Sequence, residues 1–133
     1  MIQGASQLIK GKNELIITKS LKDVMTLFEN SFSSLAPNSE GIVFSNNIIN
    51  SLYQNFPNIF LFYDNDLAGL RGARKYKNIY PNIICIFLKR KYAKDISDFF
   101  KKNEKEALNA IEELKNITIL VKDKKLLKYF YYF

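Results

Sequence analysis

Short runs of apolar residues alternate along the chain with segments of helical periodicity. The runs predict four strands, at residues 15–17, 41–44, 59–63 and 83–88. Runs of this length that are apolar at nearly every position are typical of strands buried on both faces. Strands that alternate with helices form parallel sheets covered by those helices. The sequence therefore predicts an α/β fold, with a mainly parallel sheet of about four strands flanked by helices.

Helix signals lie between these runs. Ser20 and Asp23 form a Ser-x-x-Asp capping pattern, so a helix is predicted to begin near Ser20 and to end before the segment Ala36-Pro37-Asn38. Ser45 is the expected cap of a second helix, which should end at Pro57. Further helices are predicted at residues 67–79, 95–102 and 104–115, and a last strand at residues 117–121. The expected buried stripe of the helix over 104–115 is Ala107, Leu108, Ile111 and Leu114.

The chain length of 133 residues fits one domain. We divide it into an N-terminal extension (1–13), the α/β domain (14–116) and a C-terminal strand with an aromatic tail (117–133). The tail ends in five consecutive aromatic residues, from Tyr129 to Phe133. Such rings can stack on nucleic-acid bases. More often they complete a core or pack on a neighbouring domain or partner, and we favour packing.

The composition excludes several classes of chemistry. The chain has no His and a single Cys, Cys85, which excludes Ser-His-Asp and Cys-His catalytic sets and zinc sites built from Cys and His. Cys85 lies in an apolar run and is expected to be a small core residue. One Cys allows no internal disulfide, so a reducing, cytoplasmic location is predicted. Lys and Arg number 20 against 13 Asp and Glu, and the net charge of +7 favours a polyanionic partner.

Acidic residues follow the predicted strands at the edge where parallel sheets place their functional groups. Asp64 and Asp66 come directly after the third strand, and Asp95 lies beyond the fourth. Two carboxylates about 5 Å apart repel by about 3 kcal/mol at an effective dielectric constant near 20, and a divalent cation relieves that repulsion. Oxygen ligands favour Mg²⁺ or Mn²⁺. Asp64 and Asp66 are therefore predicted metal ligands, with Asp95 as a further candidate. The alternative is that Asp66 only caps a helix.

Basic and small polar residues near the same edge are candidates for phosphate contacts. They are Lys19, Ser20, Lys22, Arg71, Arg74, Lys75, Lys89, Arg90 and Lys91. A helix N-terminus at Ser20 would add backbone N–H groups to such a contact, and Gly69 would allow a close approach of backbone or phosphate. The alternative for the run at 89–91 is an ordinary solvated surface. Asp23 is expected to be structural, as the cap partner of Ser20, and Asp98 to cap a helix or to be solvated.

Three segments resemble the motifs of a known family. Residues 60–69 (Phe-Leu-Phe-Tyr-Asp-Asn-Asp-Leu-Ala-Gly) resemble the Asp-x-Asp motif of the TOPRIM domain. Residues 15–24 match the first family motif, a strand followed by Glu-Gly-x-x-Asp, and residues 94–98 resemble the Lys-Asp-x-x-Asp segment of primase-like members. The motifs follow the family order over about residues 14–102. Within a family that also includes topoisomerases and OLD-type nucleases, the chain looks closest to phage-type DnaG-like DNA primases.

One position departs from the family pattern. The first-motif Glu falls on Lys19, and the Gly that follows it falls on Ser20. In the family, that Glu acts as a general acid or base or as a metal ligand, whereas a protonated Lys cannot coordinate a metal. Lys19 could replace one cation of a two-metal site or contact a phosphate directly. It could also mark a site that has lost catalysis.

The resemblance implies a function for the chain. It implies the TOPRIM domain of a phage-type DNA primase, which carries out Mg²⁺- or Mn²⁺-dependent nucleotidyl transfer for RNA primer synthesis in DNA replication, together with other domains or subunits. Asp64, Asp66 and Lys19 would be its catalytic residues. The implied partners are a single-stranded DNA template, nucleoside triphosphates, and a replicative helicase or other primase domains. No membrane is involved, and a phage-encoded chain would work in the host cytoplasm.

Two alternatives to a primase stay open. One is a non-catalytic nucleic-acid-binding or assembly TOPRIM domain, which Lys19 favours. The other is an OLD-like TOPRIM nuclease, which ranks lower because such an enzyme would keep the acidic residue that Lys19 replaces.

Overall fold

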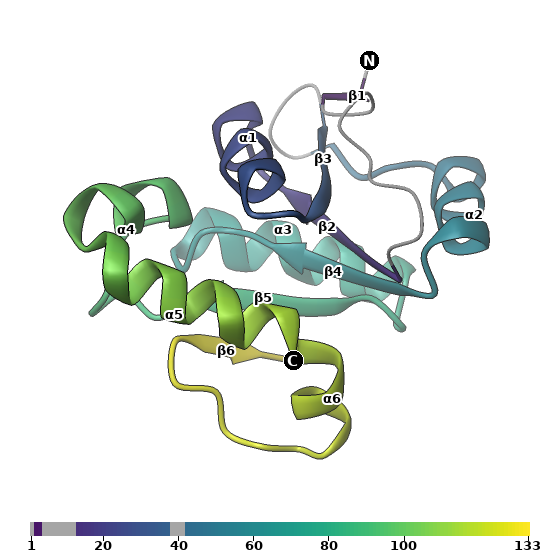
Figure 1. Cartoon of the computed structure of the whole chain (residues 1–133). Coiled ribbons are helices and arrows are strands. Elements are labelled where there is room, and N and C mark those ends of the chain that lie inside the picture. Colours follow the sequence, from purple (N-terminus) through teal and green to yellow (C-terminus); the bar gives the residue numbers. More distant parts are fainter. Residues whose placement is uncertain (1, 4–12, 38–41) are drawn as a thin grey trace.

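A six-stranded, mainly parallel sheet forms the centre of the molecule (Figure 1). The computed structural model describes residues 2–3, 13–37 and 42–133. The strands lie in the order β1-β3-β2-β4-β5-β6, in which the four central strands are parallel and the two edge strands antiparallel. The strands are β1 (Ile2–Gln3), β2 (Glu14–Thr18), β3 (Ser33–Pro37), β4 (Asn58–Phe62), β5 (Ile84–Leu88) and β6 (Phe130–Tyr132). The predicted α/β fold with a mainly parallel sheet is confirmed.

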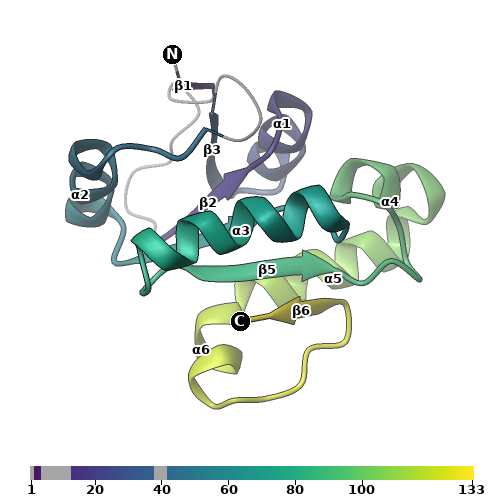
Figure 2. The same cartoon turned by 180° about the vertical axis from the view of Figure 1, so that it is seen from behind.

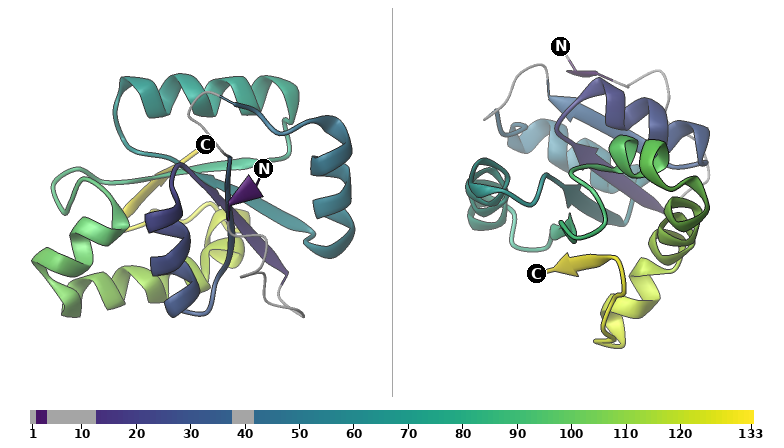
Figure 3. Two further views of the ribbon diagram at one scale, coloured as in Figure 1. Left: turned by 90° about the horizontal axis from the view of Figure 1, so that it is seen from above. Right: turned by 90° about the vertical axis from the view of Figure 1, so that its left-hand side faces the viewer.

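Helices cover both faces of this sheet. They are α1 (Leu21–Glu29), α2 (Asn46–Asn55), α3 (Leu67–Ile79), α4 (Ile96–Lys102), α5 (Glu104–Lys115) and α6 (Ile117–Lys122). Helices α1, α4, α5 and α6 lie on one face, and α2 and α3 lie on the other, as the view from behind shows (Figure 2). The same layers appear when the molecule is seen from above and from its side (Figure 3). None of the helices in the described residues is long and apolar enough to cross a membrane.

Strands β2, β4 and β5 each contribute side chains to two separate cores. In β2, Ile16 packs towards α1 and α5, whereas Leu15 and Ile17 pack towards α2 and α3. All three are at most 2% exposed. Burial on both faces is why these strands read as continuous apolar runs rather than as alternating ones.

The strand predicted at residues 41–44 is wrong. Ile42 and Phe44 belong to an irregular segment, and Gly41 lies outside the described residues. Phe44 is nonetheless buried. In place of strand partners, its backbone N–H donates to the Tyr76 hydroxyl and its carbonyl accepts from the Tyr80 hydroxyl. The strand that pairs with β2 is instead β3, whose sequence Ser-Ser-Leu-Ala-Pro lacks an apolar run. The helix predicted to continue towards Pro37 accordingly ends at Glu29.

The last strand predicted, at residues 117–121, is also wrong, because this segment forms α6. Only Ile117 of α6 is buried, while Ile119 is 63% exposed, a pattern that suits a short surface helix. The edge of β5 that such a strand would need is taken by β6. In α5 the predicted Leu108 is 45% exposed, and Ala110 takes the buried position instead.

The C-terminal tail packs on the domain itself. Leu127, Tyr129 and Phe130 are at most 4% exposed and belong to the core under α4 and α5. The Glu113 carboxylate accepts hydrogen bonds from the backbone N–H groups of Lys128 and Tyr129, at 2.8 and 2.9 Å. These contacts hold the chain in position to enter β6.

Candidate functional site

The carboxyl ends of β2, β4 and β5 meet at one edge of the sheet, because these strands are parallel neighbours. The structure brings together there three of the predicted residues, Lys19 after β2, Asp64 after β4 and Asp95 before α4. Asp64 and Asp95 line the same small cavity of about 10 Å³, together with Asp23 and Lys94. The candidate site is therefore built from residues that lie up to 76 positions apart in the sequence.

Lys19 and Asp64 form an ion pair at the centre of this edge. The Lys19 Nζ donates to Asp64 Oδ2 at 2.7 Å. The two side chains are 35% and 10% exposed, so the pair is partly shielded from water. An ammonium group thus binds the first carboxylate of the Asp-x-Asp motif.

Asp66 is the N-cap of α3. Its Oδ1 accepts the backbone N–H of Gly69 at 2.7 Å, and the residue is exposed to solvent. The backbone N–H of Asp66 donates to the carbonyl of Asp64, which fixes the turn between the two residues. A Cβ at Gly69 would lie 1.9 Å from that same carbonyl oxygen, so the turn requires glycine there. One Asp66 oxygen is used for capping, and the other is open to a ligand.

Asp23 is a buried carboxylate beside the site, 7% exposed. It accepts hydrogen bonds from the hydroxyls of Ser20 and Ser97, both at 3.2 Å. Burial raises the pKa of Asp23, and the nearby carboxylate of Asp95 and, more weakly, that of Asp64 raise this pKa further, while the Ser20 and Ser97 hydroxyls lower it. The expected cap contact with Ser20 is present. Sequence reasoning missed the contact with Ser97, which joins α1 to α4.

Replacing Asp23 by Asn is expected to raise the stability of the domain at neutral pH. The raised pKa means that the folded state holds this proton more tightly than the unfolded state. The contribution of Asp23 to stability is therefore fully present below its ordinary pKa of 3.8 and is lost as the pH rises through the folded-state value. Asn keeps two polar atoms for Ser20 and Ser97 without the charge. Most substitutions instead cost about 1 kcal/mol.

The measurement is urea unfolding of both proteins at pH 4 and pH 7. The advantage of Asp23→Asn over the parent should be larger at pH 7 than at pH 4. Asp123→Asn, which removes an exposed charge at the end of α6, is the matched control. An equal loss of stability at both pH values would show that the charge of Asp23 does not oppose folding.

Asp95 is the N-cap of α4. Its Oδ1 accepts the backbone N–H of Asp98 at 2.7 Å, and its Oδ2 lies 3.4 Å from the Nζ of Lys22. The predicted phosphate contact Lys22 thus neutralises a carboxylate in this structure. Asp98 pairs with Lys102 and accepts the backbone N–H of Lys94, as expected of a solvated residue near a helix N-terminus.

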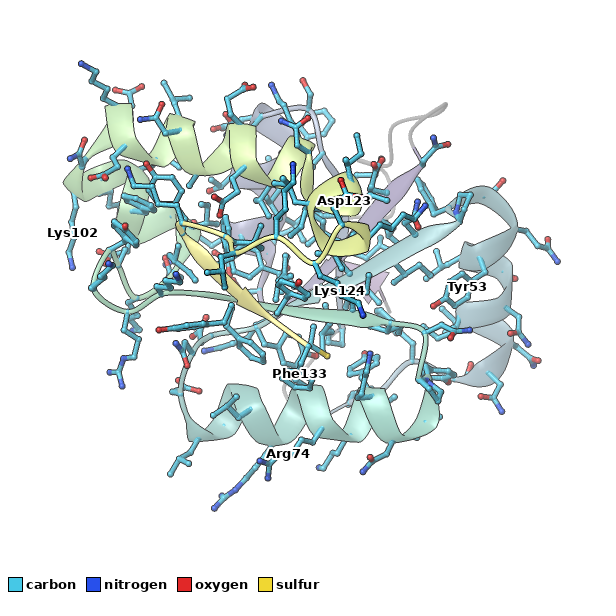
Figure 4. All side chains as sticks on the ribbon, turned by 90° about the horizontal axis from the view of Figure 1, so that it is seen from below. Tyr53, Arg74, Lys102, Asp123, Lys124 and Phe133 are labelled. Atoms are coloured by element: carbon cyan, nitrogen blue, oxygen red, sulfur yellow. The ribbon has the colours of Figure 1, made fainter. Side chains whose placement is uncertain are left out.

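A larger cavity of about 330 Å³ adjoins the ion pair. Three of the predicted phosphate-binding cations, Lys19, Arg71 and Lys75, line it together with Asp66. Arg74 does not belong to this group, because it points outward from α3 (Figure 4). The remaining lining residues are Pro37, Tyr63, Ala68, Gly69 and Gly72. The lining thus combines three cations and one carboxylate with apolar and glycine residues.

The basic run after β5 lies apart from this cavity. Lys89 donates through Nζ to the carbonyl of Leu127 at 2.8 Å and lies over the ring of Tyr131. Arg90 and Lys91 are exposed at the turn that leads to α4.

The donor atoms at the site suit a hard cation, but they do not form a preassembled metal site. Asp64, Asp66 and Asp95 offer only carboxylate oxygens, which suit Mg²⁺ or Mn²⁺. Within residues 13–37 and 42–133, no three acidic or Cys side chains converge closely enough to hold a metal ion. Cys85 is buried in β5, where burial raises its pKa to about 11, so it stays a protonated core thiol as predicted.

Comparison with known proteins identifies the family. Residues 16–100 match the sequence model of the Toprim-like family. Because this match covers more than half of the chain, the chain belongs to the Toprim-like family, and its sheet with helices on both faces is a TOPRIM fold. The prediction of a TOPRIM domain is confirmed. A comparison with curated protein sequences gave no significant match.

Two solved structures share the fold. One is the Aquifex aeolicus primase, in a structure of its zinc-binding and RNA polymerase domains, with a TM-score of 0.56 and 19% sequence identity over 74% of this chain. The chain spans only 25% of that structure. The other is a small TOPRIM domain protein from Bacillus stearothermophilus, with a TM-score of 0.52 and 14% identity over 77% of this chain and 88% of that one.

Proposed function

We propose that the chain is the TOPRIM domain of a phage-type DNA primase and takes part in RNA primer synthesis during DNA replication. The observation that carries this proposal is the edge described above. Asp64 and Asp66 follow β4, Asp64 and Asp95 line one small cavity, and a basic cavity of about 330 Å³ adjoins them. Carboxylates beside a basic cavity suit a reaction in which a triphosphate and a metal ion are held together.

In this proposal the residues have distinct roles. Asp64 and Asp66 hold Mg²⁺ or Mn²⁺, and Asp95 is the third candidate ligand. A bound metal supplies charge stabilisation for the phosphoryl group and activation of the attacking hydroxyl. Arg71 and Lys75 hold phosphates in the cavity. When a metal ion and a phosphate are both bound, the ammonium group of Lys19 leaves Asp64 and contacts the phosphate.

A second candidate function is non-catalytic binding of nucleic acid. The Lys19–Asp64 ion pair favours it, because the ammonium group already neutralises the carboxylate that a metal would use. In this alternative, Lys19 with Arg71 and Lys75 binds a phosphate without any metal. The domain would then serve assembly or template binding.

Other parts of a primase are also part of the proposal. Since the chain spans about a quarter of the Aquifex aeolicus structure, we propose that primer synthesis needs further domains or subunits. A replicative helicase, a single-stranded template and nucleoside triphosphates are the proposed partners, and the cytoplasm is the proposed location.

A Mn²⁺ titration followed by paramagnetic broadening of backbone amide signals tests the catalytic proposal. We expect selective loss of the signals of residues 64–69, and no such loss in the Asp64→Asn/Asp66→Asn variant. Asp123→Asn is the matched control and should broaden like the parent. A template-directed ribonucleotide incorporation assay then distinguishes primer synthesis from cleavage of the template. Uniform broadening at millimolar Mn²⁺, with DNA binding retained in the double variant, would favour the non-catalytic function.

A further inference from the structure

Two aromatic rings of the C-terminal tail are exposed on the outermost strand of the sheet. In β6, Phe130 is 1% exposed and faces the core under α5. Tyr131 and Phe133 point to the opposite face, where they are 57% and 44% exposed. The two rings are neighbours on one face of the sheet, and contiguous exposed apolar surface of this kind can mark an interaction site. The packing that explains the rest of the tail therefore does not explain these two rings.

The two rings are held in place by their neighbours. Phe133 stacks on the buried Phe87 of β5, with ring centroids 5.6 Å apart and planes at 19°, so one of its faces is covered. In Figure 4, Phe133 lies at the end of β6, beside α3. Tyr131 is opposite Phe87 in the ladder, and the Nζ of Lys89 lies 5.0 Å from the centroid of its ring. A hydrogen bond to the Leu127 carbonyl fixes Lys89 there. We call Tyr131, Phe133 and Lys89 the tail platform.

The segments that adjoin the tail platform in the sequence are basic. Arg90 and Lys91 directly follow Lys89, and residues 89–91 contain no acidic residue. Residues 122–128 carry four Lys and one Asp. Glu113, which lies close to this segment, already binds two backbone N–H groups. The charge of this region is thus complementary to a polyanion.

The tail platform lies close to the candidate site. Strand β6 is two strands away from β4, which corresponds to about 10 Å across the sheet. Because β6 is antiparallel to β5, it begins next to Leu88, at the same edge as Asp64, with Tyr131 one position and Phe133 three positions further from that edge along β5. A chain of nucleotides can therefore contact both places. Tyr131 and Phe133 lie outside residues 16–100, which match the family, whereas Lys89 lies within them.

We propose that the tail platform binds single-stranded nucleic acid by stacking of bases on Tyr131 and Phe133, with Lys89 at the phosphate backbone. Tyr131 of β6 and Phe133, which directly follows β6 and still bonds to the backbone of Cys85, are alternate residues of one extended segment. They are about 6.8 Å apart along it, a spacing that allows successive unstacked bases to use one ring each. A duplex cannot present unstacked bases, so single strands should be preferred. The proposal adds a binding site to the proposed function and rests on that function only for choosing nucleic acid among polyanions.

Fluorescence anisotropy with labelled oligothymidylate and oligouridylate, in EDTA, tests the proposal. Tyr131→Ala should weaken binding about tenfold, and Tyr131→Phe should bind within about twofold of the parent because the ring remains. Phe28→Ala is the matched control, since Phe28 is 41% exposed on α1 and lies on the opposite face. A duplex competitor of equal length should compete poorly. Because EDTA removes divalent metals, failure of the metal-dependent function leaves this test unaffected.

Photo-crosslinking with 5-bromouracil in the oligonucleotide provides a second readout, and the crosslinked peptide should contain Tyr131 or Phe133. Parental affinity in Tyr131→Ala, crosslinks confined to other segments, or no binding of single strands would overturn the proposal. Sedimentation of the same variants tests whether the exposed rings mediate self-association instead. If Tyr131→Ala abolishes self-association and leaves oligonucleotide binding unchanged, the exposed rings form a protein interface instead.

Discussion

Replacing Gly69 by Ala is expected to lower the free energy of unfolding by about 3 kcal/mol or more. An Ala Cβ would lie 1.9 Å from the carbonyl oxygen of Asp64. The position of the Cβ is fixed by the backbone of α3, and the carbonyl is itself a backbone group, so no side-chain rotation can relieve the overlap. Ala has the higher helix propensity, which favours the variant by about 1 kcal/mol. The steric overlap outweighs that gain. Because the overlap displaces the backbone of Asp64, the Lys19–Asp64 ion pair should be lost as well.

Gly72→Ala is the matched control for this prediction. A Cβ at Gly72 would lie 2.8 Å from Cε2 of Tyr63, which belongs to a side chain that can shift. Its cost should be smaller, about 1 kcal/mol, because the gain in helix propensity offsets part of the contact. Urea unfolding of the two variants gives the comparison. If Gly69→Ala is as stable as Gly72→Ala, the close approach of α3 to the Asp64 carbonyl does not constrain the fold.

The parts of the fold that the sequence predicts well are those with strong local signals. The sequence predicts α3 at its observed bounds, because a polar break at residues 64–66 precedes it and Pro81 follows it. The strand β4 is an apolar run followed by a polar break, so its end and the position of Asp64 follow directly. Its approximate place in the sheet follows from the alternation of strands and helices.

The errors have a common physical cause, which is that tertiary partners override local patterns. Both Ser residues of β3 are buried, and Ser34 donates to the carbonyl of Val24, a contact that no local pattern reveals. Residues 117–121 have the β-branched composition of a strand. They form α6 because the edge of the sheet is already occupied by β6.

In the candidate site, too, the features with a local sequence signal are predicted and those set by tertiary contacts are not. The positions of Lys19 and Asp64 at one edge follow from the predicted parallel sheet. The direct ion pair between them, and the hydrogen bond from Ser97 to Asp23, depend on contacts 45 and 74 residues apart. Such contacts have no local signal in one sequence. The resemblance to the TOPRIM motifs marks Lys19 as unusual from the sequence alone.

Replacing Lys19 by Glu is expected to increase the affinity for Mn²⁺ at least about tenfold, which corresponds to about 1.4 kcal/mol. The change removes the ammonium group that binds Asp64 at 2.7 Å and adds a carboxylate beside Asp64, with Asp95 nearby. Without metal, the variant should be less stable than the parent by about 1–2 kcal/mol, because like charges are then brought together. Addition of Mn²⁺ should restore stability by mass action.

Two further variants separate the causes of this effect. Lys19→Gln removes the ammonium group without adding an acid and should give an intermediate affinity for Mn²⁺. Lys115→Glu makes the same change of net charge at an exposed position of α5 and should leave Mn²⁺ binding unchanged. Isothermal titration calorimetry and thermal unfolding with and without Mn²⁺ give the two readouts. If Lys19→Glu binds Mn²⁺ no better than Lys115→Glu, the ammonium group is not what limits metal binding. The carboxylates Asp64, Asp66 and Asp95 would then be too widely separated to share an ion, and metal-free binding of nucleic acid would be the better account of the domain.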